Sequence, residues 1–146
     1  MTRWMTALLL AGLMTGAPLA AQGARTFKTR LSPVPVAAFN PNVVGTGTVS
    51  ATLTGSRMVV SGTYEGLASP ATQARVFKSP KPGIRGEALF DLTVSGGTTG
   101  TISGTIELTP AQVQELAASR YYVQLHSEKA ADGNLWGWLQ PQENRR

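Results

Sequence analysis

Short runs that alternate apolar and small polar residues fill the chain and limit the folds that it can adopt. In TGTVSATLTG, residues 46–55, Val49, Ala51 and Leu53 recur at every second position, and RMVVSGTYEGL follows almost at once. A period of two residues is typical of a β-strand with one buried and one solvated face, and two neighbouring runs of this kind indicate an antiparallel hairpin. GTISGTIELT, residues 100–109, repeats the pattern.

The remaining elements complete an all-β pattern with one exception. Further strands are expected at residues 26–31, 73–77, 84–94, 120–127 and 134–141. Thr109, Pro110 and Gln112 have the spacing of a capping box with proline at the first helical position, so one short helix is expected over 109–119. Seven to eight short strands with glycine-rich turns are typical of a sandwich or a barrel. We predict an antiparallel, Greek-key-like β-sandwich with this one helix.

The N-terminal residues have the pattern of an export signal. Arg3 precedes an apolar run over 6–14, and small residues that include Ala20 and Ala21 follow it. The run is shorter than the roughly 20 residues that cross a bilayer, so no stable membrane span is expected after cleavage. We predict a signal peptide over 1–21 and a secreted or periplasmic protein. Behind it we expect a lead at 22–25, one domain at 26–140 and a flexible tail at 141–146.

Cysteine content and charge narrow the function further. The chain has no cysteine, which excludes thiolate metal sites and thiol catalysis and fits a bacterial exported protein that folds without disulfides. It has 13 Lys and Arg against 8 Asp and Glu, a net charge of +5, of which +4 remains once Arg3 is removed. A positive excess favours anionic partners. For an exported protein these are a cell-surface polymer or an acidic protein, and no nucleic acid is expected.

The order of the later motifs resembles a known family. ATQARVF, GIRGEAL, TPAQVQEL and YYVQLHSEKAADGNLWGWL follow one another here. This order resembles the CHRD domain, which is common in exported bacterial proteins, and the resemblance spans residues 26–140. In that family two histidines usually stand at the places of Arg75 and Phe77. His126 and Gly137 keep family positions, whereas Trp136 replaces an arginine. The resemblance supports the fold and implies no defined biochemical activity.

His126 is the one histidine of the chain, and two interpretations of it stay open. A metal site or a catalytic base is one interpretation, but zinc, copper and iron sites need three or four ligands, largely His and Cys. A half-buried strand histidine bonded to a neighbouring backbone group is the other. We expect no cofactor and no catalysis. A metal-binding or enzymatic β-sandwich centred on His126 is the alternative hypothesis.

Two tryptophans and a basic stretch form the candidate binding surface. Trp136 and Trp138 are two residues apart on an expected strand and therefore point to the same face, either into the core or outward as an aromatic platform. The basic stretch holds Arg75, Lys78, Lys81 and Arg85 with no acid between them. Its arginines have Glu87 and Asp91 as possible partners. We predict a non-catalytic binding or structural module that uses this surface.

Overall fold

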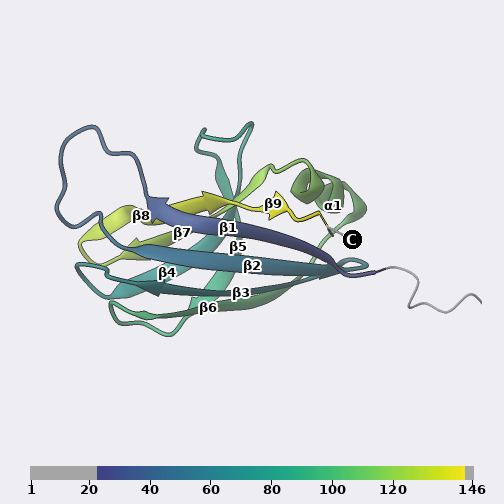
Figure 1. Ribbon diagram of the computed structural model, residues 1–146. Coiled ribbons are helices and arrows are strands. Elements are labelled where there is room, and N and C mark those ends of the chain that lie inside the picture. Colours follow the sequence, from purple (N-terminus) through teal and green to yellow (C-terminus); the bar gives the residue numbers. More distant parts are fainter. Residues whose placement is uncertain (1–22, 144–146) are drawn as a thin grey trace, which may run out of the picture.

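The alternating runs form antiparallel strands in the computed structural model, which describes residues 23–143 (Figure 1). The elements are β1 (Arg25–Pro33), β2 (Thr46–Thr54), β3 (Arg57–Glu65), β4 (Ala71–Lys78), β5 (Glu87–Val94), β6 (Gly100–Glu107), α1 (Pro110–Ala117), β7 (Tyr121–Ser127), β8 (Ala130–Trp138) and β9 (Gln140–Pro141). The predicted signal peptide lies outside the described residues. Within them, no helix is long and apolar enough to cross a membrane.

Most strands turn their apolar positions inward, as the alternation predicts, whereas β7 is buried on both of its faces. In β2 the side chains of Val49, Ala51 and Leu53 are buried, and the threonines and the serine between them face outward. A large core results, and its largest fully buried side chains include Tyr64, Tyr121, Phe27, Leu31 and Met58. A small second cluster of Val34, Val43 and Ala130 packs against Trp136. The solvated face of each strand is therefore the outer surface of the molecule, where any binding site has to lie.

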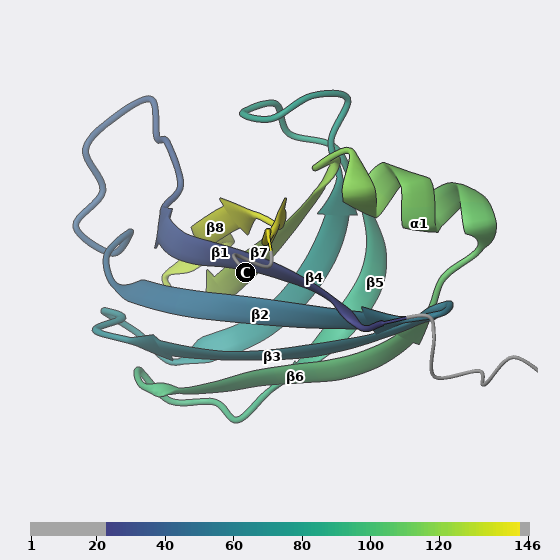
Figure 2. The same ribbon diagram turned by 45° about the vertical axis from the view of Figure 1, so that its right-hand side comes forward.

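The strands close on themselves, so the predicted sandwich is wrong and the fold is a barrel. The order around the barrel is β1-β2-β3-β6-β5-β4-β7-β8, and β1 closes the ring because it pairs with both neighbours. Its residues 25–31 pair with β2, whereas Ser32 and Pro33 pair with β8. A sandwich would leave these edges open. Figure 2 shows β1, β2, β3 and β6 as one wall, with β4, β5, β7 and β8 behind it.

The connections between strands have the expected Greek-key order. β4, β5 and β6 form a meander, β3 lies beside β6, and β7 lies beside β4. The segment from β6 to β7 carries α1 over one end of the barrel, whereas the loop between β1 and β2 projects from the other end (Figure 1). The helix has the predicted capping box: Thr109 Oγ1 accepts from the backbone of Gln112, and the Gln112 side chain accepts from the Thr109 N–H.

Three local expectations need correction. Residues 84–86 were expected to start β5, but they belong to the loop, and β5 begins at Glu87. The segment 128–133 was expected to be a loop, yet the turn is confined to Glu128 and Lys129 and β8 starts at Ala130. The tail was expected to be free from residue 141. Pro141 pairs with β1 instead, and the N–H of Gln142 donates to the Thr26 carbonyl.

Candidate binding face

The strand register brings most of the predicted site residues to one wall. Two rows cross β4, β7 and β8 on the outer surface. Arg75, Gln124 and Trp136 form the first row, and Phe77, Tyr122 and Trp138 form the second. His126 lies on the same side of β7 as Tyr122 and Gln124. We call the side chains of Phe77, Tyr122, His126, Trp136 and Trp138, which lie outside the barrel wall, the aromatic face. Tyr122 and the adjacent Gln124 are buried beneath their neighbours on this face.

The rings of the aromatic face are in contact with one another. The centroids of Phe77 and Tyr122 are 5.0 Å apart in a stacked arrangement, and those of Tyr122 and Trp138 are 4.6 Å apart. Trp136 and Trp138 meet edge to face at 4.6 Å. The two tryptophans therefore point outward from the barrel, while Leu135 and Leu139 fill the core. Both indoles are nevertheless half-buried, because they pack against each other and against their neighbours.

The loop between β4 and β5 covers one margin of the aromatic face. The guanidinium carbon of Arg85 lies 5.6 Å from the Trp136 ring centroid, within the range of a cation–π contact. Arg85 Nη1 donates to the Asp132 carbonyl at 3.3 Å, and the N–H of Gly86 donates to the Tyr122 hydroxyl at 3.0 Å. These contacts hold a cation over the rings.

The four basic residues of the predicted surface are not equivalent. Arg75 pairs with Asp91 at 2.8 Å, as one of the two predicted partners, and Lys78 pairs with Glu115 of α1 at 2.7 Å. Among residues 23–143, Lys81 and Arg85 form no ion pair. The positive charge available to a ligand on this wall therefore lies in the β4–β5 loop.

Lys78 does not reach the aromatic face, because it belongs to the helix-covered end of the barrel. Its ammonium and the Tyr121 hydroxyl donate to the two carboxylate oxygens of Glu115, each at 2.7 Å. The hydrogen bond from Lys78, followed by that from Tyr121, holds the pKa of Glu115 below its ordinary value. Burial, together with the adjacent Glu115 carboxylate, raises the pKa of Tyr121. This trio attaches α1 to the barrel and is a structural feature.

His126 is held by neighbouring polar groups, as its structural interpretation expects. Nδ1 donates to the Ala131 carbonyl at 2.8 Å, and Nε2 lies 3.4 Å from the Gln124 amide nitrogen, which can donate to it. The described part of the chain contains no group of three or more His, Cys, Asp or Glu residues that could hold a metal ion. The chemical groups that this wall offers to a ligand are therefore aromatic rings beside the cation of Arg85.

Two residues of this wall were missed by the sequence analysis. Tyr122 touches three other rings, and Gln124 lies in the row between Arg75 and Trp136. The Gln124 carbonyl oxygen is buried and has no hydrogen-bond partner among the described residues. Tyr122 and Gln124 stand at alternate positions from His126 along the strand and therefore point to the same face. This spacing could have been read from the sequence.

Gly137 occupies a point of close approach between strands. A Cβ at this position would lie 2.5 Å from Thr29 Oγ1 and 2.6 Å from the Arg30 carbonyl. Only glycine therefore lets β1 cross β8 where the barrel closes. The family glycine at this position has a role in closing the fold.

The family model of the CHRD domain matches residues 27–139, which is most of the chain. The chain belongs to the CHRD domain family. No curated protein and no solved structure matches it significantly. In this CHRD domain the two motif positions Phe77 and His126 bring their rings to a centroid distance of 6.2 Å on the outer wall.

Proposed function

We propose that this CHRD domain is an exported, non-catalytic binding module for an acidic cell-surface polysaccharide. The N-terminal signal pattern supports export to a secreted or periplasmic location. The observation that carries the proposal is the placement of Arg85 over Trp136 at the margin of five contacting aromatic rings.

An acidic sugar matches both parts of this margin. The apolar face of a sugar ring packs on an indole, which offers a large flat area at little conformational cost. A carboxylate or sulfate group accepts charge-assisted hydrogen bonds from a guanidinium, with Lys81 on the same loop as a second cation. A neutral sugar would use the rings alone, and a simple anion would use the cations alone.

The local chemistry favours binding over catalysis. His126 Nδ1 is engaged by the Ala131 carbonyl, and its nearest side-chain partner is the amide of Gln124, which is neither an acid nor a base. A general base is normally oriented by a carboxylate or placed beside a nucleophile. Among residues 23–143, His126 has no hydrogen bond to a carboxylate or to a nucleophilic side chain, so the alternative function centred on His126 lacks this support.

Calorimetric titration of the purified protein with a size-defined oligogalacturonate tests the proposal, with a neutral oligosaccharide of equal length as the ligand control. We expect saturable binding of the acidic chain that weakens with added salt. Arg85→Ala should reduce the affinity about tenfold, the value of one charge-assisted contact.

Arg57→Ala is the matched control, because it removes the same charge from an exposed position on β3. It should leave the affinity within about twofold. Equal loss in both variants would show attraction to net charge alone and overturn the assignment. Saturable binding of an acidic protein with no binding of the acidic sugar would replace the polymer by a protein partner.

A further inference from the structure

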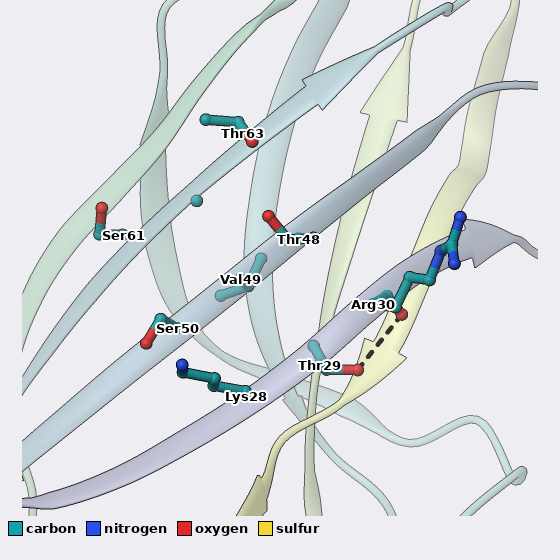
Figure 3. Close-up of a pocket in the computed structure, with 9 residues that line it drawn as sticks. Lys28, Thr29, Arg30, Thr48, Val49, Ser50, Ser61 and Thr63 are labelled. Atoms are coloured by element: carbon teal, nitrogen blue, oxygen red, sulfur yellow. Dashed lines mark hydrogen bonds between the residues drawn. The ribbon is translucent and has the colours of Figure 1, made fainter.

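A hollow lies on the wall opposite the aromatic face. It is formed on the outer surface of β1, β2 and β3 and has a volume of about 650 Å³ (Figure 3). Because β2 and β3 lie across the closed ring from β4 and β7, the hollow shares no residue with the aromatic face. The outward side chains that line it are Lys28, Arg30, Thr48, Ser50, Ser61 and Thr63.

The strand register arranges these side chains in two parallel rows. Arg30, Thr48 and Thr63 form one row, and Lys28, Ser50 and Ser61 form the other. Each row thus begins with a cation on β1 and continues with two hydroxyls on β2 and β3. Figure 3 shows the two pairs of hydroxyl-bearing side chains on neighbouring strands, with Lys28 beside Ser50.

Two glycines bend the wall at the hollow. A Cβ on Gly62 would lie 2.6 Å from the Thr48 carbonyl, and a Cβ on Gly47 would lie 2.6 Å from the Thr63 carbonyl. Glycine at both positions lets β2 and β3 coil tightly against each other, which is how curvature enters a sheet.

The six outward polar side chains of the hollow have no side-chain partners in the part of the chain that the structure describes. Within residues 23–143, none of these six side chains makes a hydrogen bond through its side-chain atoms or an ion pair, and no carboxylate is among the residues that line the hollow. Arg75 and Lys78 elsewhere on the barrel are both paired with acids. Unpaired donors that line one hollow favour a ligand rich in oxygen acceptors.

The shape of the surface indicates a chain rather than a single ion. A second hollow of about 570 Å³ adjoins the first and shares Arg30, Thr48 and Thr63 with it. It continues the first row to Thr101 of β6, which pairs with Thr63. The two hollows together form one groove across four strands, and Glu65 is the one carboxylate among the residues that line them.

We propose that this groove is a second glycan-binding site, which takes a segment of an acidic polysaccharide. The four hydroxyls exchange hydrogen bonds with sugar hydroxyls, and Lys28 and Arg30 hold carboxylate or sulfate groups along the chain. The site is independent of the aromatic face. Two sites on opposite walls let one molecule hold two segments of polymer, which raises avidity without new contacts.

Backbone amide shifts of the isotope-labelled protein, followed by nuclear magnetic resonance during titration with oligogalacturonate and in parallel with sulfated dextran, test this site. We expect saturable shifts in residues 28–30, 48–50 and 61–63. The double variant Lys28→Ala with Arg30→Ala should weaken the affinity at these residues at least about tenfold, as expected for two lost charge-assisted contacts. Ser61→Tyr, which fills the hollow and keeps its charge, should also weaken it.

Arg57→Ala is again the matched control, and it should leave the titration of the groove unchanged. Shifts that stay absent from the groove with both polymers, or that weaken equally in Arg57→Ala, would overturn the second site. Because signals from Trp136 are followed in the same spectra, failure of the aromatic face and failure of the groove are read separately.

Discussion

Arg85 holds its guanidinium over the indole of Trp136, with the Cζ atom 5.6 Å from the ring centroid. The two residues are far apart in the sequence, and the hydrogen bond from Arg85 to the Asp132 carbonyl ties the β4–β5 loop to the start of β8. The protein thus keeps a cation at the aromatic face without help from an ion pair.

Arg85→Ala should uncover Trp136 with little effect on the fold. We expect a red shift of tryptophan emission because the indole gains water, and a loss of at most about 1 kcal/mol in the free energy of unfolding, the usual value of an exposed cation–π contact. Emission spectra and urea unfolding measure the two effects. An unchanged spectrum would show that Arg85 does not cover the ring in solution.

Acid should weaken the attachment of α1 through Glu115. The hydrogen bonds from Lys78 and Tyr121 hold the pKa of Glu115 below its ordinary value. Its carboxylate therefore stabilises the fold at neutral pH, and the contribution is lost as the pH falls through the folded pKa. Glu115→Gln should lower the free energy of unfolding by about 1 kcal/mol at neutral pH and flatten its decline in acid. Urea unfolding across this range measures both.

Glu128→Gln is the control for that experiment, because Glu128 is exposed in the turn between β7 and β8. It should change neither the stability nor its dependence on pH. If both variants show the same acid profile as the unchanged protein, the Glu115 contacts contribute nothing.

Gly137→Ala should destabilise the closure of the barrel. The new Cβ would meet the Arg30 carbonyl at 2.6 Å, and backbone atoms cannot move aside cheaply, so we expect a loss of about 2–3 kcal/mol. Gly104→Ala is the comparison, because its Cβ would meet a flexible methyl of Leu92 at 2.6 Å. Gly137→Ala should have a lower unfolding temperature than Gly104→Ala. The reverse order would refute this account of closure.

The sequence predicted the strands better than their closure. Alternation placed Val49, Ala51 and Leu53 inside correctly, and the capping box located α1. Closure depends on Ser32 and Pro33 pairing with β8, and only two residue pairs form that seam. A contact this short leaves no periodic signal. The segment 128–133 was expected to be a loop, yet Gly133, with φ of 137°, lies inside β8.

The candidate site was predicted only in part, because its contacts also depend on pairing between strands that are distant in the sequence. Side-chain parity placed Trp136 and Trp138 on one side of their strand, and the register showed which neighbours they meet. The sequence could not show which residues of the basic stretch are paired with acids, because the partner of Lys78 is Glu115, on a helix that is distant along the chain. The groove on β1, β2 and β3 was also missed, since outward hydroxyls are usual on any solvated strand.

His126→Ala should change neither metal content nor overall fold. We expect a modest loss of about 1 kcal/mol from the hydrogen bond to the Ala131 carbonyl. Metal analysis of the purified protein by mass spectrometry, beside this variant, is the measurement. Stoichiometric metal that disappears in the variant would contradict a binding function of this face and make His126 its centre.

An acidic glycan is proposed to bind at the aromatic face. The indole Nε1–H signals of Trp136 and Trp138 test this binding most directly. They should be followed by nuclear magnetic resonance during titration with oligogalacturonate, with Trp136→Phe to assign them. The account predicts a saturable shift of the Trp136 signal that is weakened by Arg85→Ala and unaffected by Arg57→Ala. Indole signals that do not move at saturating ligand would contradict it.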